Sequence, residues 1–182
     1  MRCLSALRSC SFSADSSYQP MLSVGAWAYA ADGFGLEGSG AGAGPSVEYF
    51  EILATLSGLE AILAVDRTQR VIRVHTDSEF ALRFLRYASE RAPLPRSKAM
   101  DRVRMRYEGA TTLISQRCVY FSKVTHSMPE HKACHRSAAR RLRQELAGCP
   151  DMKQRVGFRT AEQRVGVPAE GPGPRAVSAA GD

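Results

Sequence analysis

The sequence predicts one α/β domain followed by a flexible tail. Short β-rich runs alternate with longer helical patterns over residues 4–147, as expected for a sheet covered by helices. A chain of 182 residues has the length of one domain with a real core. Three carboxylates stand at the edges of the predicted elements, namely Asp15, Glu51 and Asp77.

Five strands are expected, each from a short run of apolar and β-branched residues. The first run ends just before Asp15, and an Asp32-Gly33 turn signal separates the second run from the third. Val71–Thr76 is apolar enough to be a central strand. The expected strands span residues 4–14, 23–30, 34–38, 71–76 and 118–124.

Residues 38–44 alternate glycine with small residues, and we expect them to form a flexible connector. A phosphate-binding loop is the alternative for such a run. The segment lacks the Gly-Lys-Ser/Thr ending and the flanking strand that this loop requires. A plain connector is therefore the prediction.

Four helices are expected. Ser46 is a suitable N-cap for the first, whose apolar residues run nearly all round it, as in a helix pressed on a sheet. Pro93 and Pro95 separate the second helix from the third. The helices are expected at 45–65, 78–89, 97–115 and 130–147. Core candidates on the second and third are Phe80, Leu82, Phe84, Leu85, Val103, Tyr107, Ala110 and Ile114.

The chain carries a net charge of +7, and this excess is localised. Basic residues crowd segments 83–106 and 136–143. Such a surface is expected in a protein that binds a polyanion, although arginine-rich helix faces that only contact water give the same composition. Three acids gathered in a basic protein would repel phosphate unless cations lay between them. The carboxylates therefore favour an enzyme over a plain binder.

Other features of the sequence bear on the compartment. No apolar run is long enough for a membrane-spanning helix. The acid-free segment before Asp15 resembles an organelle transit peptide. We assign it to the first strand instead, because the strand that leads to the candidate ligand Asp15 must come from these residues. Five cysteines without paired spacing are expected to be thiols, which predicts a cytoplasmic protein. From Gly148 onward the composition turns rich in Pro and Gly, and residues 148–182 are expected to be a flexible tail.

The three carboxylates have the chemistry of a metal site. Mg²⁺ prefers hard oxygen ligands, so two such ions about 4 Å apart need carboxylates that converge from separate elements. Strand ends and a helix that crosses the same sheet supply that convergence. The candidate ligands are therefore Asp15, Glu51 and Asp77.

Over residues 4–147 the chain resembles the type-1 ribonuclease H family. The resemblance rests on four segments in the order in which that family has them, and Thr76-Asp77-Ser78 matches outright. The other segments are Phe12-Ser13-Ala14-Asp15-Ser16, the helical Glu51 with Glu60 nine residues later, and a last block of Lys123-Val124-Thr125-His126-Ser127, Pro129-Glu130 and Cys134-His135.

The resemblance implies a ribonuclease H-like, mixed five-stranded sheet flanked by helices. The implied activity is endonucleolytic hydrolysis of the RNA strand of RNA–DNA hybrids with 5′-phosphate products, RNA being identified through its 2′-hydroxyl groups. His126, on a loop after the last strand, would shuttle a proton or help release the cleaved phosphate. The implied cofactors are two Mg²⁺ or Mn²⁺ ions, held by Asp15, Glu51, Asp77 and His135. We expect the hybrid as partner, no membrane, and a monomer.

The chain also departs from the family pattern. His135 stands where the family usually has Asp, and imidazole binds Mn²⁺ well but Mg²⁺ poorly. Ser16 replaces a glycine, and the Asn usually found ahead of the helical Glu is missing. There is no room for the basic protrusion that some members insert between the second and third helices. We expect His75 to be a core or supporting residue, and His131 to be exposed on the last helix.

Two other functions remain open. Another nuclease of the ribonuclease H superfamily, such as an exonuclease or a junction resolvase, would share the carboxylates, but the His126 loop and the Thr-Asp-Ser segment argue against it. The second is a weakly active or non-catalytic module that binds hybrid or RNA on the same fold. The intact acids argue against this module, because a pure binder gains nothing from keeping them.

Overall fold

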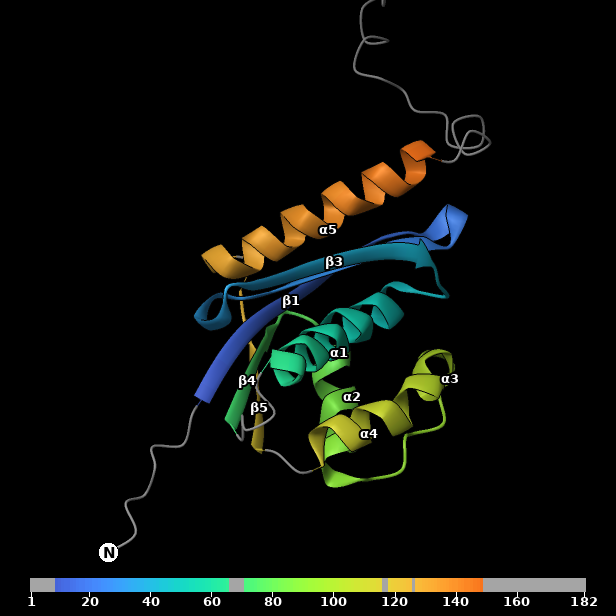
Figure 1. The fold of residues 1–182 in the computed structure, drawn as a ribbon. Coiled ribbons are helices and arrows are strands. Elements are labelled where there is room, and N and C mark those ends of the chain that lie inside the picture. The colour runs from blue at the N-terminus through green and yellow to red at the C-terminus, as the bar shows by residue number, and fades with distance from the viewer. Residues whose placement is uncertain (1–8, 66–70, 116–117, 126, 149–182) are drawn as a thin grey trace, which may run out of the picture.

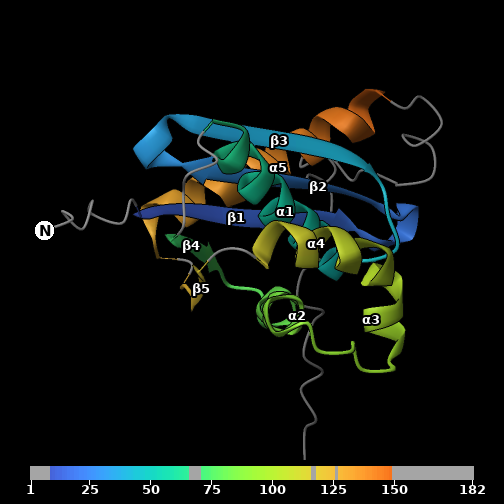
Figure 2. The same cartoon turned by 60° about the horizontal axis from the view of Figure 1, so that its bottom comes forward.

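The computed structural model describes residues 9–65, 71–115, 118–125 and 127–148, which form three layers around one mixed sheet (Figures 1 and 2). The strands are β1 (Ser9–Gln19), β2 (Val24–Ala31), β3 (Leu36–Ala43), β4 (Val71–Thr76) and β5 (Cys118–Lys123). Their order is β3-β2-β1-β4-β5. The β1–β2 and β2–β3 pairs are antiparallel, whereas β4 is parallel to both β1 and β5. The prediction of a mixed five-stranded sheet with flanking helices is confirmed.

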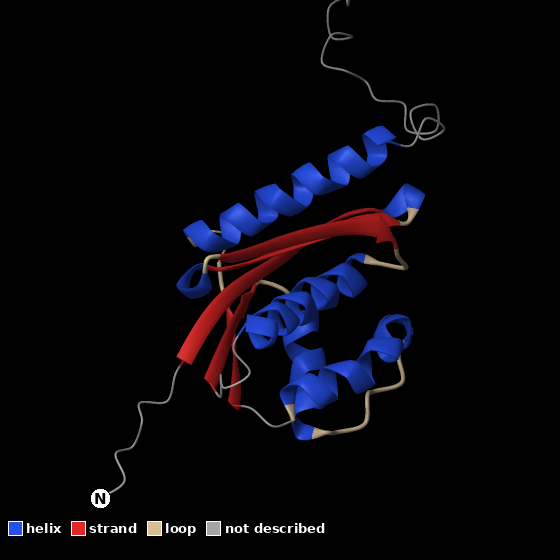
Figure 3. Cartoon of the chain, viewed as in Figure 1, coloured by secondary structure: helices blue, strands red, loops and turns tan. Residues whose placement is uncertain are grey.

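One long helix covers one face of the sheet, and the other helices lie on the opposite face (Figures 1 and 3). The long helix, α5 (Pro129–Gly148), packs on β1, β2 and β3. The helices of the opposite face are α1 (Val47–Val65), α2 (Glu79–Glu90), α3 (Lys98–Val103) and α4 (Tyr107–Ile114). Within the described ranges, no helix has both the length and the apolar character needed to cross a membrane.

Helix α1 packs on the middle of the sheet and carries the centre of the core. The Ser46 hydroxyl accepts a hydrogen bond from the Tyr49 N–H at 3.4 Å, which agrees with its expected role as N-cap. Gly58 brings α1 close to β1, because a Cβ at this position would lie 2.4 Å from the Phe12 ring. The largest fully buried side chains include Phe12, Phe50, Ile52, Leu59, Ile62, Ile72 and Phe84.

The glycine-rich run was expected to be a connector, and this prediction is wrong, because Leu36–Ala43 is the edge strand β3. The reason lies on the neighbouring strand. Gly38 pairs with Tyr29 and Gly40 with Trp27, and a Cβ on either glycine would lie within 2.6 Å of the paired ring. The two rings stack with their centroids 6.3 Å apart. Aromatic rings that lie across a glycine backbone stabilise a strand which its own residues would not predict.

Two further boundaries differ from the prediction. Strand β1 continues to Gln19, so Asp15 lies within it and does not follow its end. The helix expected at 97–115 is interrupted by a 3-10 turn at Arg104–Arg106. The Arg106 guanidinium of this turn donates a hydrogen bond to the Tyr49 hydroxyl at 2.8 Å. The apolar face predicted for this helix continues on both sides of the turn. The expected core residues that are buried are Phe84, Leu85, Val103, Ala110 and Ile114, and those partly buried are Phe80, Leu82 and Tyr107.

Two glycines inside helices provide a test of the contact between α1 and β1. Alanine normally stabilises a helix interior by about 0.5–1 kcal/mol relative to glycine. We expect that gain for Gly109→Ala on α4, because a Cβ there meets no atom within 4 Å. Gly58→Ala should instead destabilise the protein by about 1–3 kcal/mol, because the methyl group meets the Phe12 ring. Urea unfolding of both variants measures the two changes, and equal stabilisation of both would contradict the close approach.

Candidate functional site

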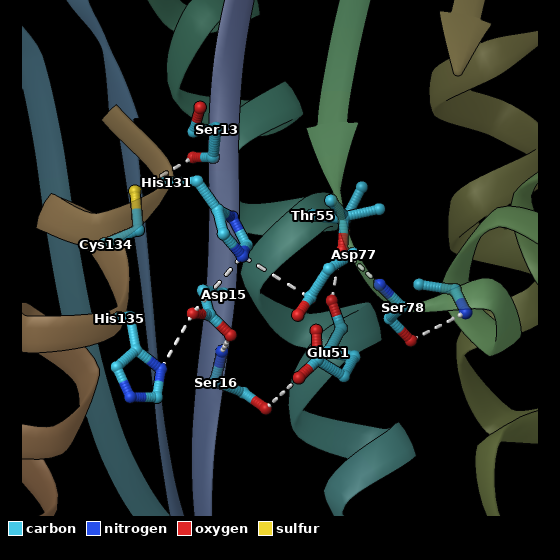
Figure 4. A network of polar contacts seen from close by, with 12 residues as sticks. Ser13, Asp15, Ser16, Glu51, Thr55, Asp77, Ser78, His131, Cys134 and His135 are labelled. Atoms are coloured by element: carbon cyan, nitrogen blue, oxygen red, sulfur yellow. Dashed lines mark hydrogen bonds and ion pairs between the residues drawn. The ribbon is translucent and has the colours of Figure 1, made fainter. Parts of the chain in front are cut away.

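Asp15 and Asp77 lie side by side because β1 and β4 are parallel neighbours. Ser13 pairs with His75 in this register, so Asp15 follows two residues later within β1, and Asp77 follows two residues later just past the end of β4. Both carboxylates lie near α5, because His131 Nε2 is 3.6 Å from Asp15 Oδ2 and 3.5 Å from Asp77 Oδ1. Figure 4 shows them between β1 and the end of β4. The Asp15 side chain is 5% exposed and that of Asp77 is 25% exposed.

The Thr76-Asp77-Ser78 segment holds Asp77 through hydrogen bonds on both sides of it. The Thr76 hydroxyl oxygen accepts a bond from the Ser78 N–H at 3.2 Å. The Ser78 hydroxyl oxygen in turn caps α2 by accepting a bond from the Ala81 N–H, also at 3.2 Å. The two hydroxyl residues therefore fix the backbone that carries Asp77, where the strand turns into the helix.

Glu51 reaches the same place from helix α1 (Figure 4). Its Oε1 accepts a hydrogen bond from the Ser16 hydroxyl at 2.5 Å, while the Ser16 N–H donates to Asp15 Oδ1 at 2.6 Å. Ser16, where a glycine was expected from the resemblance, thus connects two of the acids. Glu51 Oε2 is buried and has no hydrogen-bond partner among the described residues. Burial raises the pKa of Glu51 to about 8.

Two histidines of α5 complete the cluster. His131 Nε2 lies 3.6 Å from Asp15 Oδ2 and 3.5 Å from Asp77 Oδ1. One ligand atom from each of these three residues lies within 4.8 Å of the other two. His135 Nδ1 lies 3.0 Å from Asp15 Oδ2, and the His135 side chain is 58% exposed at the rim of the site. Both imidazoles approach Asp15 from α5 (Figure 4).

The expectation that His131 is exposed is wrong, since this residue is fully buried. The sequence holds a signal that would have found it. The buried positions of α5 follow at spacings of three and four, which is the period of one helix face. His131 opens that face, and its buried members are His131, Cys134, Ala138, Leu142 and Leu146.

The remaining residues singled out in the sequence lie elsewhere. His126 lies outside the described residues. His75 is half-buried and lines a separate cavity of about 110 Å³ together with Glu130. Burial lowers the pKa of His75. Glu60 is exposed on α1 and takes no part in the cluster.

The residues of the cluster fit a divalent cation. A buried carboxylate is stable only when a positive charge or hydrogen-bond donors compensate it. Burial raises the pKa of Asp15 as it does that of Glu51, so burial disfavours the charged form of both groups. The buried Glu51 Oε2, which has no hydrogen-bond partner in the part of the chain that the structure describes, offers a hard oxygen ligand. Asp15, Glu51, Asp77 and His135 could therefore hold metal, and His131 is added to the expected set by the geometry.

No family model and no curated protein matches the chain. The fold is similar to the crystal structure of RNase H1 from the halophilic archaeon Halobacterium salinarum NRC-1, with a TM-score of 0.54 and 16% sequence identity. The match covers 75% of this chain and 99% of that chain. At this level of identity, the comparison shows a ribonuclease H-like fold.

The raised pKa of Glu51 predicts how stability depends on pH in metal-free protein. Its value in the folded state, about 8, lies above the ordinary 4.5, so the folded protein binds this proton more tightly than the unfolded chain. The resulting stabilisation is complete below pH 4.5 and is lost as the pH rises to about 8. Glu51→Gln removes this loss, so at pH 8 the variant should be more stable than the wild type by on the order of 2–4 kcal/mol.

Chemical unfolding in EDTA at pH 5 and pH 8 measures the effect, with the exposed Glu60→Gln on the same helix as the control. The control should keep the pH slope of the wild type. Parallel pH profiles for the wild type and Glu51→Gln would show that the carboxyl group of Glu51 is not perturbed.

Proposed function

We propose that the chain is a divalent-metal-dependent endonuclease that hydrolyses the RNA strand of RNA–DNA hybrids and leaves 5′-phosphate ends. The observation that carries this proposal is the convergence of Asp15, Glu51 and Asp77 from β1, α1 and the end of β4 on a ribonuclease H-like fold. Two of these acids, Asp15 and Glu51, are buried, and neighbouring buried carboxylates are unfavourable unless positive charge compensates them.

The roles of the side chains follow from their contacts. Asp15 of β1, Asp77 just past the end of β4 and Glu51 of α1 would hold divalent cations. Bound there, such cations would supply activation of the attacking water and stabilisation of the leaving 3′ oxygen. The Ser16 hydroxyl orients Glu51 through its hydrogen bond to Oε1. We assign His126 to proton transfer or product release, as the resemblance implies.

Basic residues near α1 support a nucleic acid as the substrate. Arg106 donates a hydrogen bond to the Tyr49 hydroxyl and lies 5.5 Å from the centre of that ring. Tyr49 precedes Glu51 by two residues, so this contact ties the basic segment to the turn of α1 that carries a metal ligand. Other exposed basic side chains of segment 83–106 are Arg83, Arg86, Arg91, Arg96, Lys98, Arg102 and Arg104. They supply positive charge of the kind that a phosphate backbone attracts.

We place the enzyme in the cytoplasm as a monomer. Cys10 and Cys134 carry thiols, as expected in a reducing compartment. Other nucleases of this fold share the carboxylates, and a substrate panel separates them from the proposed activity. The panel consists of labelled RNA–DNA hybrid, duplex RNA, duplex DNA and a four-way DNA junction, each with Mg²⁺ and then with Mn²⁺. Cleavage within the RNA strand of the hybrid alone is the expected result.

Asp77→Asn tests the metal-dependent mechanism. The amide keeps the shape of the side chain but removes the charge that attracts the cations, so hybrid cleavage should fall by about 100-fold or more while hybrid binding persists. Asp101→Asn is the matched control, because Asp101 lies on α3 in an exposed ion pair with Arg104. Near-normal cleavage by a folded Asp77→Asn protein would rule out the assignment of Asp77.

A further inference from the structure

We propose that His131 and His135, one helical turn apart on α5, join Asp15 and Asp77 in a mixed nitrogen–oxygen site that selects Mn²⁺ or a similar transition-metal ion over Mg²⁺. This inference deepens the proposed function, on which it rests for the presence of a catalytic cation. It assigns one of the two cation positions to the α5 side of Asp15 and gives that position imidazole ligands.

The first argument is the spacing along the helix. Residues i and i+4 lie on one face of a helix, and two histidines at this spacing can bind one metal ion. Here the first histidine is buried at the sheet and the second lies at the rim of the site. Both imidazoles approach the same oxygen, Asp15 Oδ2: His131 from the buried side, where it also lies near Asp77, and His135 from the rim. The Asp15 carboxylate is therefore the place at which the two histidines meet.

The second argument is the set of distances. Ligand atoms about 2.1 Å from one ion lie about 3.0–3.4 Å from each other when they occupy adjacent coordination positions. The distances from His131 Nε2 to Asp15 and Asp77 are 3.6 and 3.5 Å, and that from His135 Nδ1 to Asp15 is 3.0 Å. The two His131 distances exceed those of a normal N–H···O hydrogen bond. They are close to the spacing of atoms that share a cation, so small side-chain shifts would form the site.

The third argument is the division of the cluster into two sides. Glu51 approaches from α1 and is held by Ser16, whereas the imidazoles approach from α5 (Figure 4). The α1 side offers only oxygen, which suits Mg²⁺ or Mn²⁺ equally. The α5 side offers two nitrogens, which Mg²⁺ accepts poorly and Mn²⁺, Co²⁺ or Zn²⁺ accept readily. Selectivity should therefore reside on the α5 side.

The competing explanation is that protonated His131 and His135 act as counter-ions for the aspartates without any metal. Pulsed electron paramagnetic resonance on full-length wild-type protein with bound Mn²⁺ separates the two. Metal ligation predicts magnetic coupling between Mn²⁺ and imidazole nitrogen, with a pattern that changes when the histidines are labelled with ¹⁵N. Bound Mn²⁺ without nitrogen coupling, or no bound Mn²⁺ at all, would overturn the proposal.

Variants of the two histidines then identify which imidazole nitrogens bind Mn²⁺. In titrations that follow the signal of free Mn²⁺, His131→Asn and His135→Asn should each lower Mn²⁺ affinity by about 10-fold or more. Mg²⁺ affinity, measured by competition with Mn²⁺, should change by less than about 3-fold. His75→Asn is the matched control, because His75 lies in a separate cavity, and it should leave both affinities unchanged. Unchanged Mn²⁺ affinity in both folded α5 variants would overturn the assignment.

His135→Asp tests the origin of the metal selectivity. A carboxylate at this position adds a hard, charged ligand, so Mg²⁺ affinity and Mg²⁺-supported hybrid cleavage should rise and the advantage of Mn²⁺ should narrow. The same metal dependence in His135→Asp and wild type would show that His135 is not a ligand. These tests separate the two proposals. Nitrogen-coupled Mn²⁺ in a protein that cleaves no hybrid would contradict only the proposed function, and hybrid cleavage without nitrogen coupling would contradict only the mixed site.

Discussion

The parallel pairing of β1 with β4 holds Asp15 and Asp77 next to each other, and the repulsion between the two carboxylates has to be balanced within a few ångströms. Glu51 adds a third acid, which is buried and has one oxygen without a hydrogen-bond partner among the described residues. The surroundings supply two kinds of balance. Ser16 donates hydrogen bonds to two of the acids, and the imidazoles of α5 approach the aspartates. A site built in this way is least favourable when it is empty and ionised, so a cation bound there would stabilise the fold.

The distance between the layers follows from small residues on either side of β1. On one face, Gly58 brings α1 against Phe12, three residues ahead of Asp15. On the other face, Ala28 of β2 packs with Cys134 and Ala138 of α5, and the Cys134 thiol lies 3.3 Å from the Ser13 carbonyl oxygen. Larger side chains at these positions would move the helices outward. The acids and imidazoles would then no longer meet, so the packing of small residues determines the geometry of the site.

Sequence patterns identified the parts of this structure that depend on local information. The ends of α1 and β4 agree with the prediction because an N-cap, an apolar run and the Thr-Asp-Ser turn are all local signals. The edge strand β3 was missed because its stability comes from Trp27 and Tyr29 on another strand. His131 was misjudged because it was considered alone and not as the first member of the buried face of α5. The convergence of Asp15 and Asp77 depends on a strand register that the sequence could suggest only through a resemblance.

The pairing of Trp27 with Ser16 across β1 and β2 has an optical consequence. Trp27 is the single tryptophan of the chain, and its ring lies over Gly40 beside Tyr29. Cβ atoms of directly paired residues lie about 5 Å apart, so the Trp27 backbone stands beside the serine whose hydroxyl group holds Glu51, while the indole ring leans over β3. A shift of β1 at the carboxylate cluster would therefore be passed to the strand that carries this fluorophore. Tryptophan fluorescence, which needs no label, is expected to follow such shifts.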